Sequence, residues 1–302
     1  MYIISNFTSN FLKMMKNHLY HTAIFLLFLW FNIAMNIQAQ THQHDLQSVT
    51  NVNNYVGVSM VSLADPYLSV LNYSGLGLRL EYNELKYYNP AKPVWVEFAR
   101  IEGLGAMTYN PAYTAMITYV GTEIAYGTLY EYRDLNNIVL HAGGNIDANY
   151  AVKMNSRNVN NPTNMDIATN LNAMIGIRYN IPTKKRVMQL ATQIEFPLLG
   201  CMFVPYPGLS YYEMYNSKKV AEAIHFSSLH NKQGVRQRLT FQMPFKYSSW
   251  TVGVSMQALK YQASEQPYQM QEFSVFLGVN YDVARFAGRK SNKPENFISP
   301  GL

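Results

Sequence analysis

The sequence predicts an all-β protein: a transmembrane antiparallel up-and-down β-barrel of about ten strands, with eight to twelve possible. Apolar and polar residues alternate over runs of 11–17 residues, longer than the usual strand of a soluble protein. Only 14% of the 302 residues are charged, whereas a soluble domain carries about a quarter. Tyrosine is abundant, with 24 residues. Long alternating strands in a chain poor in charge favour a barrel in a membrane.

The stretch at residues 272–286, "EFSVFLGVNYDVARF", shows the alternation most clearly. Its apolar face carries Phe273, Val275, Leu277, Val279, Tyr281 and Val283. Its other face carries Ser274, Phe276, Gly278, Asn280 and Asp282. A period of two residues is typical of a strand whose two faces meet different surroundings. The same pattern recurs at 137–154, 166–181, 235–245 and 251–258, and more weakly at 54–64, 75–88, 94–109, 113–132 and 187–201.

The polar faces indicate which side of these strands is the inside. They hold Asn, Gly, Thr and Gln, with single charges at Glu97, Glu123, Asp147, Arg178 and Glu195. Small polar residues and pairs of opposite charge suit a crowded lumen, where side chains must satisfy one another. We therefore expect the apolar faces to contact lipid. Ten strands leave little room inside once the charges pair, so a wide pore is not expected.

The connections between the predicted strands differ in length in the way that such barrels require. With the C-terminus taken as periplasmic, the turns at 133–137, 182–185 and 247–249 are short, and those at 154–165 and 202–233 are longer and lie outside. Short periplasmic turns and long outer loops are typical of these barrels. Tyrosines at strand ends are candidates for the two interfacial girdles: Tyr87, Tyr88, Tyr109, Tyr113, Tyr130, Tyr132, Tyr247 and Tyr281.

The two ends of the chain are expected to lie outside the barrel. Residues 1–39 have the layout of a secretory signal peptide, with Lys13 and Lys16 before an apolar core and Ala39 at the cleavage site. A single membrane anchor is the alternative, and translation could start at Met1, Met14 or Met15. We expect a periplasmic lead at 40–53, the barrel at 54–286 with its main outer loop at 202–233, and a periplasmic tail at 287–302.

Composition limits the partners. The only cysteine, Cys201, cannot form an intrachain disulfide, and no run of basic residues exceeds the three of Lys184–Arg186, so nucleic-acid binding is not expected. No cofactor or metal site is expected either. The predicted location is the outer membrane of a Gram-negative bacterium. The expected partners there are outer-membrane lipid, lipopolysaccharide and the barrel assembly machinery, and the chain is expected to be a monomer.

One short motif could carry chemistry. In "AIHFSSLHN", His225 and Ser227 stand two residues apart, so on a strand they share a face and could form a hydrogen bond that activates the hydroxyl. Asn231 or Glu213 could orient the histidine. The motif is similar to the His-x-Ser of outer-membrane phospholipase A and lipid A deacylase, although the Asn-Gly that follows in the phospholipase and its calcium ligands are absent. An acyl-ester hydrolase is therefore the alternative to the favoured non-enzymatic role, which is structural, binding or narrowly conductive.

Four blocks resemble a known family. They are "DPYLSVLNYSGLGLRLEY", "FPLLGCMFVPYPGLSYYEMY", "HFSSLHNKQGVRQRLTFQMPF" and "ISPGL", at 65–82, 196–215, 225–245 and 298–302. In this order they resemble an uncharacterised Bacteroidetes family classed as a domain of unknown function. The resemblance covers most of residues 55–302 and implies an exported outer-membrane barrel. It implies no activity, ligand or catalytic residue.

Overall fold

The computed structural model describes residues 47–158, 161–184, 186–206, 209–245, 248–263, 266–283 and 297–300. The expected signal peptide, most of the expected lead and the first part of the expected tail lie outside these residues. The first barrel strand begins at Thr50, so the last four residues of the segment expected as a lead belong to the barrel. Among the described residues, no helix is long and apolar enough to cross a membrane.

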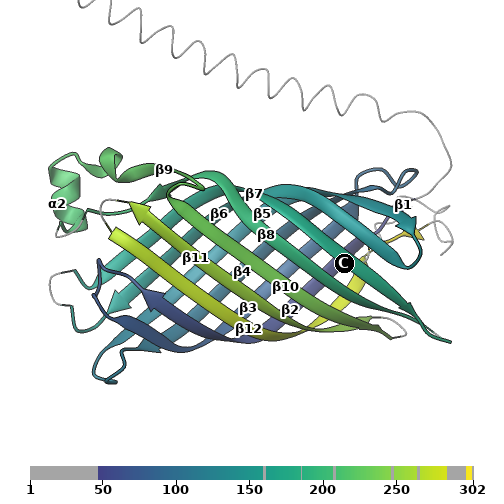
Figure 1. The fold of residues 1–302 in the computed structure, drawn as a ribbon, viewed down its shortest axis with the longest axis horizontal. Helices are drawn as coiled ribbons and strands as arrows, with labels where there is room; N and C mark the ends of the chain where they lie inside the picture. The colour runs from purple at the N-terminus through teal and green to yellow at the C-terminus, as the bar shows by residue number, and fades with distance from the viewer. Residues whose placement is uncertain are drawn as a thin grey trace, which may run out of the picture. The chain divides into compact units, whose positions relative to one another are not determined.

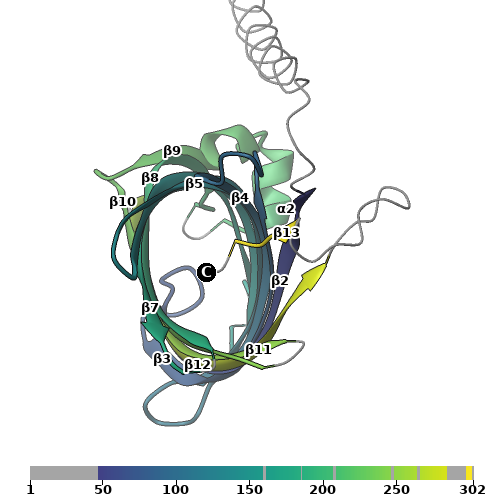
Figure 2. The ribbon, with the colours of Figure 1, turned by 90° about the vertical axis from the view of Figure 1, so that its right-hand side faces the viewer.

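Ten antiparallel strands form a closed barrel (Figure 1), which confirms the predicted fold class and strand number. Their bounds are β2 (Thr50–Ala64), β3 (Asn72–Tyr87), β4 (Trp95–Tyr109), β5 (Met116–Leu135), β6 (Ile138–Asn155), β7 (Thr163–Pro182), β8 (Val187–Phe203), β10 (Lys232–Pro244), β11 (Ser249–Ala263) and β12 (Gln266–Val283). Consecutive barrel strands are neighbours all round the ring, as an up-and-down barrel requires. Figure 2, which looks along the barrel, shows the strands surrounding the lumen.

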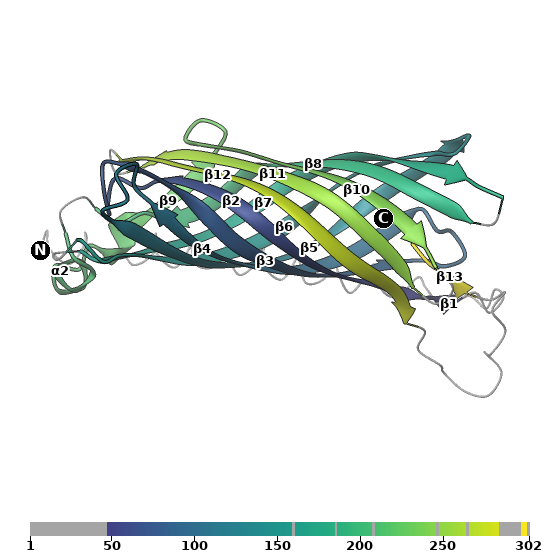
Figure 3. The same ribbon diagram turned by 90° about the horizontal axis from the view of Figure 1, so that it is seen from below.

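Two strand pairs close the ring. The last strand, β12, pairs with the first, β2, from Gln269↔Ala64 to Val283↔Thr50, and β8 pairs with β10 over seven residues. Closure matters because an unpaired backbone N–H or C=O group facing hydrocarbon costs several kcal/mol, on the order of 2–7. The run of β12 beside β2 is visible in Figure 3.

The side chains of the barrel strands have the polarity that the alternation predicted. On β12, Val275 and Leu277 are about half exposed on the outer surface, while Ser274 and Asn280 are buried inside. Because apolar side chains cover the outside and polar ones fill the inside, the outer surface matches hydrocarbon and not water. The inner face also carries apolar side chains, among them Phe276, whose ring packs edge-on against Tyr55 at 5.2 Å.

The tyrosine prediction holds for part of its set. Six of the expected girdle tyrosines are exposed: Tyr88, Tyr109, Tyr113, Tyr130, Tyr132 and Tyr281. Tyr87 is instead fully buried inside the barrel, where its hydroxyl donates a hydrogen bond to Glu131. The strand period explains this correction, since Tyr87 and Tyr88 are neighbours and cannot face the same way. Tyr247 lies outside the described residues.

The longest connection, between β8 and β10, carries the elements that lie beside the barrel. They are the helix α2 (Tyr211–Asn216), the 3-10 turn η1 (Val220–Ala223) and the short strand β9 (Ile224–Ser228). β9 pairs with the outer end of β8, from Leu199↔Ser228 to Phe203↔Ile224. At the other end of the barrel, β1 (Gln47–Ser48) pairs in parallel with β13 (Phe297–Ile298).

The assignment of the lipid face leads to a prediction on β12. Replacing Leu277 with arginine places a charge in hydrocarbon and is expected to lower the free energy of unfolding by about 2–4 kcal/mol, whereas arginine at Gln271, on the same face near the outer end, should cost about 0–1 kcal/mol. Denaturant unfolding in lipid vesicles measures both variants. Equal costs at the two positions would contradict a lipid-facing surface at Leu277.

Candidate functional site

Nine charged side chains form a network across the middle of the lumen, here called the charge belt. Its members are Arg79, Glu81, Arg100, Glu102, Glu123, Glu195, Arg236, Arg238 and Glu272. Eight of the nine are buried; Arg238 is partly exposed. They come from β3, β4, β5, β8, β10 and β12. The belt is therefore built from most of the wall and not from one loop.

Strand register explains why acids and bases meet here. Glu81, Glu102 and Glu123 are directly paired neighbours on β3, β4 and β5. Three adjacent carboxylates repel one another strongly in a low-dielectric interior. The arginines lie at the same level of the barrel, so each carboxylate of the row has a guanidinium within reach.

The contacts of the arginines cross the lumen. The Arg236 guanidinium on β10 lies 2.8 Å from Glu102 and 2.7 Å from Glu123, on strands half a ring away. Arg100 lies 2.7 Å from Glu123 and 3.0 Å from Glu195. These ion pairs join opposite walls, so they close the lumen at this level.

The remaining members extend the belt toward β12 and β3. Arg79 contacts Glu102 and lies 2.9 Å from Glu272. Arg238 donates both of its terminal amino groups to Glu81, a bidentate arrangement that fixes the guanidinium plane. Paired and hydrogen-bonded in this way, the charges avoid the large cost of a lone buried ion.

The outer end of the lumen is closed by the connection between β2 and β3, here called the outer cover (residues 65–71). Its Asp65 carboxylate lies 2.5 Å from the ammonium of Lys153, which is completely buried and also lies 2.8 Å from Asp166. The Leu68 carbonyl accepts hydrogen bonds from the amides of Asn155 and Asn158. The cover is thus attached to β6 and β7 by both charge and hydrogen bonds.

Two tyrosine hydroxyls connect the cover with the β8–β10 connection. Tyr67 of the cover donates to the carbonyl of Leu209. Tyr211 donates to the amide oxygen of Asn164, whose amino group donates to Asp65 of the cover. Burial raises the pKa of both phenols, and the nearby acid Asp65 adds to the rise. Both groups therefore remain protonated donors well above neutral pH.

The inner end of the lumen is filled by apolar side chains and a second group of charges. The apolar cluster consists of Leu85, Tyr87, Val96, Phe98, Leu129 and Met174. Glu131 is buried beside it and pairs with Arg133 and with Arg178. His141 lines a small cavity of about 50 Å³ nearby, and both its ring nitrogens are buried without a hydrogen-bond partner among the described residues. A few waters would fit that space.

A larger cavity lies between the charge belt and the outer cover, here called the outer cavity. Its volume is about 140 Å³. The charged residues of its floor include Arg236 and Asp147, and its walls include Tyr119, Tyr261 and Tyr268. The outer cavity thus combines charged and aromatic side chains.

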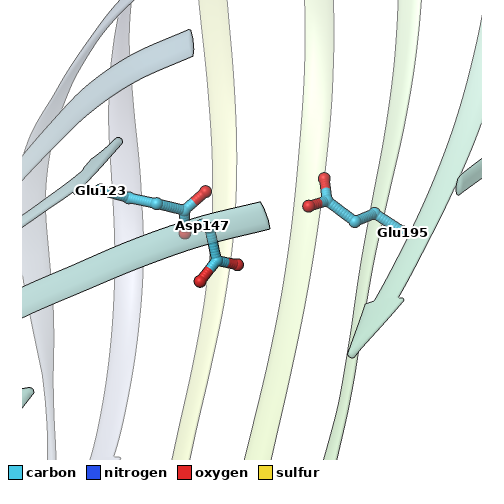
Figure 4. A group of neighbouring side chains, drawn as sticks. All are labelled: Glu123, Asp147 and Glu195. Atoms are coloured by element: carbon cyan, nitrogen blue, oxygen red, sulfur yellow. The ribbon is translucent and has the colours of Figure 1, made fainter. Parts of the chain in front are cut away.

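Three carboxylates beside this cavity lie close enough together to suggest a metal site. Glu123, Asp147 and Glu195 bring one oxygen each within 4.8 Å of the others (Figure 4). Their oxygens already accept hydrogen bonds, from Arg100 and Arg236 on the two glutamates and from Asn170 and Asn172 on Asp147. Two guanidinium groups at this position repel a cation, so the donor set does not fit a metal.

The structure places the residues of the predicted His-x-Ser motif on β9. His225 pairs with Met202 and Ser227 with Gly200 on β8, so the two side chains share the face that Met202 presents to the interior. Ser227 is almost completely buried. The opposite face of β9 carries the exposed Ile224 and Phe226.

The two residues expected to orient the histidine have local structural contacts. Asn231 accepts a hydrogen bond from the backbone of Ser228 and donates one to the carbonyl of Phe226, which holds the turn after β9. Glu213 accepts from the backbone N–H of Ser210 and lies in a capping box at the start of α2. That hydrogen bond lowers the pKa of the Glu213 carboxyl.

The inward orientation of some belt residues was predicted correctly from the sequence, and one other charged residue was predicted on the wrong face of its strand. Glu123 and Glu195 were expected inside and are there. Glu97 was expected inside too, but it has the phase of the outward-facing Trp95 and Ile101 and lies partly exposed on the outer face of β4. Arg79, Arg100 and Glu102 were not recognised as inward-facing. Each alternates with outward-facing apolar residues on its strand, and that alternation places its side chain inside the barrel.

The belt leads to a prediction on stability. Replacing Arg100 with methionine leaves Glu123 and Glu195 without one of their counter-charges, and the free energy of unfolding should fall by about 3–5 kcal/mol. Replacing the exposed loop residue Arg157 with methionine should change it by less than about 0.5 kcal/mol. Denaturant unfolding in vesicles measures both, and similar values for the two variants would show that the belt does not stabilise the fold.

Several solved outer-membrane barrels have a similar fold. The outer membrane protease OmpT from Escherichia coli is 6% identical, with a TM-score of 0.45, over 80% of this chain and 99% of that one. The translocator domain of the autotransporter NalP from Neisseria meningitidis is 9% identical, with a TM-score of 0.40, over 86% and 96%. Ail from Yersinia pestis is 8% identical, with a TM-score of 0.31, over 76% and 98%. These matches carry no functional argument.

The location follows from the surface. Bacterial barrels with an even number of antiparallel strands, an apolar outer face and a polar interior are outer-membrane proteins, and this chain has all three features. It is an outer-membrane β-barrel of a Gram-negative bacterium.

No curated protein matches the sequence. A family model described as "Protein of unknown function (DUF3316)" matches residues 23–290, which include all ten barrel strands. The chain belongs to the DUF3316 family.

Proposed function

We propose that this chain is a non-enzymatic barrel whose lumen is closed to solute flow and whose outer end binds a ligand. The charge belt is the single observation that carries the first half of this proposal, because its ion pairs join opposite walls of the lumen. The outer cavity supports the second half, since it lies above the belt and is separated from the inner end. A narrow channel would require the belt to rearrange.

The wider context of the proposal comes from the sequence. We place the protein in a bacterium of the Bacteroidetes, exported with residues 1–39 as a signal peptide and folded by the barrel assembly machinery. It acts there as a monomer surrounded by outer-membrane lipid and lipopolysaccharide, without nucleic acid or a cofactor. The apolar outer face of the barrel supports the lipid contact.

The acyl-ester hydrolase is the competing hypothesis, and the geometry gives it little support. An enzyme that cleaves acyl chains at the outer leaflet needs its serine within reach of lipid, but Ser227 is buried on the inner face of β9. Asn231 and Glu213 hold a turn and a helix start. A Ser–His hydrogen bond of 2.5 Å joins Ser228 and His230, on an exposed turn.

A conductance measurement tests the closed lumen. The purified protein in a planar lipid bilayer is expected to show no stable open channel, because the belt and the inner apolar cluster both obstruct the lumen. A general porin in the same lipid serves as the positive control. Stable steps on the nanosiemens scale would contradict the proposal and make the protein a pore.

A lipid-hydrolysis assay tests the competing hypothesis. The parent protein, Ser227→Ala and the matched control Ser228→Ala are incubated with phospholipid or lipid A, with and without calcium, and heat-modifiable gel mobility confirms folding. We expect no acyl release above background from any of them. Release that is lost in Ser227→Ala and kept in Ser228→Ala would establish a nucleophile, since removing one lowers turnover by orders of magnitude.

A further inference from the structure

A completely buried lysine lies between two aspartates beneath the outer cover. Lys153 on β6 has no exposed surface, and its Nζ atom lies 2.5 Å from Oδ2 of Asp65 and 2.8 Å from Oδ2 of Asp166. Asp65 belongs to the outer cover and Asp166 to β7. The lysine belongs neither to the charge belt nor to the lining of the outer cavity. Three separate parts of the chain thus bring together an amine and two carboxyl groups.

The surroundings of this lysine are aromatic. Its ammonium lies 4.3 Å from the centre of the Tyr268 ring, which is stacked on Tyr261 with the ring centres 4.5 Å apart. Tyr67 and Leu68 of the cover are buried in the same apolar cluster as these two tyrosines. A low-dielectric environment penalises charged groups, so it favours an uncharged amine and a carboxylic acid over an ammonium and a carboxylate. The uncharged amine of a lysine is a nucleophile.

The carboxyl group of Asp65 is held by donors on both of its oxygens. The backbone N–H of Tyr67 donates to Oδ1 at 3.1 Å, and the amide of Asn164 donates to Oδ2 at 2.8 Å. Asn164 is itself held by the hydroxyl of Tyr211. Fixed donors of this kind stabilise the negative oxygen that develops when a nucleophile adds to a carboxyl carbon. Asp65 is therefore oriented and polarised toward the lysine.

Asp166 is placed to carry protons. Its two carboxylate oxygens lie 2.8 and 2.9 Å from Nζ of Lys153, within the distance at which a general base can accept a proton. Its side chain is 22% exposed, against 3% for Asp65, and it lines the outer cavity. A water that forms beside Asp166 can therefore leave into this cavity.

We propose that Lys153 and Asp65 condense to form an isopeptide bond, which ties the outer cover covalently to β6. After Asp166 has taken a proton from the ammonium, Nζ attacks Cγ of Asp65, and the N–H of Tyr67 binds the oxyanion that forms at Oδ1. The two protons that the nitrogen loses pass through Asp166 to Oδ2, and the bond between Cγ and Oδ2 breaks. The ammonium and the carboxylate thus become one neutral amide and one water, and no other reactant is needed.

The folded site favours this reaction in two ways. Condensation removes two charges from a buried position, where they are costly, and the closed site excludes the water that would hydrolyse the bond. Lys153 and Asp65 stand 88 positions apart in number. The bond therefore closes a long loop, which lowers the conformational entropy of the unfolded chain.

Mass spectrometry of the protein isolated from outer membranes tests the bond. Once N-terminal sequencing has identified the first residue of the isolated chain, its intact mass should be lower than the mass of that sequence by one water. Proteolysis should release a branched peptide that joins the segments around Asp65 and Lys153. An intact mass equal to that of the sequence, or a branched peptide that joins other residues, would overturn the proposal.

Refolding shows when the water is lost. Protein taken from inclusion bodies in denaturant should have the full mass, because the site exists only in the folded barrel. The same sample should lose one water after it folds into detergent micelles. Loss of the water before folding would contradict a reaction promoted by the folded site.

Three variants assign the roles. Lys153→Arg keeps the positive charge, but a guanidinium is not deprotonated in proteins and cannot attack, so this variant should keep the full mass. Asp166→Ala should also keep it, because the proton carrier is missing. The matched control Lys232→Arg changes the other buried lysine of the described lumen and should still lose the water.

Heat-modifiable gel mobility confirms that each variant is folded. Water loss that persists in Lys153→Arg would place the bond elsewhere and overturn the proposal, and water loss in Asp166→Ala would overturn the role of Asp166. The mass and the branched peptide of the parent protein decide whether the bond exists even where a variant does not fold.

Discussion

Three glutamates stand side by side on β3, β4 and β5, and their mutual repulsion is the constraint on which the rest of the lumen depends. Glu81, Glu102 and Glu123 are paired in register, so the three carboxylates start from adjacent backbone positions whatever rotamers they adopt. Cations at the same level make such a row tolerable in a buried site. Arg79 and Arg100 supply part of this charge from the same wall. Arg236 and Arg238 of β10 supply the rest from the far wall, through contacts across the lumen.

This solution works only in a narrow barrel. A ring of ten strands brings opposite walls close enough for an arginine on β10 to contact glutamates on β4 and β5, whereas a ring of sixteen or more encloses an aqueous channel. The lumen is consequently arranged in layers: the inner apolar cluster, the charge belt, the outer cavity and the outer cover. The small number of strands thus brings the charges of opposite walls together, and the ion pairs between these charges close the lumen.

The sequence was sufficient for the fold because alternation records which environment each face meets. Val275 and Leu277 on β12 were assigned to lipid from their period alone, and they lie on the outer surface. The belt was harder to predict, because Arg236 and Glu102 are 134 positions apart in number and meet only through ring closure. Errors arose where a residue was assigned to one face of its strand from its chemical type and not from its position in the alternation. Glu97 was placed inside because it is charged, and Tyr87 outside because it is aromatic.

The chemistry of the candidate site was less accessible to sequence reasoning than the fold. Nothing in the spacing of Asp147, Asn149, Asn170 and Asn172 marks them as a group, since two lie on β6 and two on β7 and only the register joins them. The His225 and Ser227 pair was visible because the motif is local. A local motif indicates that two side chains share a face, but the identity of that face depends on which strand pairs with β9.

The wall beside the outer cavity differs from the rest of the barrel. The β8–β10 ladder ends at Glu195↔Arg236, and farther out β8 pairs with β9. Pro197 contributes to this break because it has no N–H to donate, and a side-chain carbon added at Gly234 on β10 would lie 3.2 Å from its ring. The last β8–β10 pair is thus also part of the charge belt. The backbone ladder between β8 and β10 is therefore intact at the belt and absent directly above it. If the outer cavity binds a ligand as proposed, a gap in this wall above an intact belt would let the ligand exchange at the outer end without opening a path across the membrane.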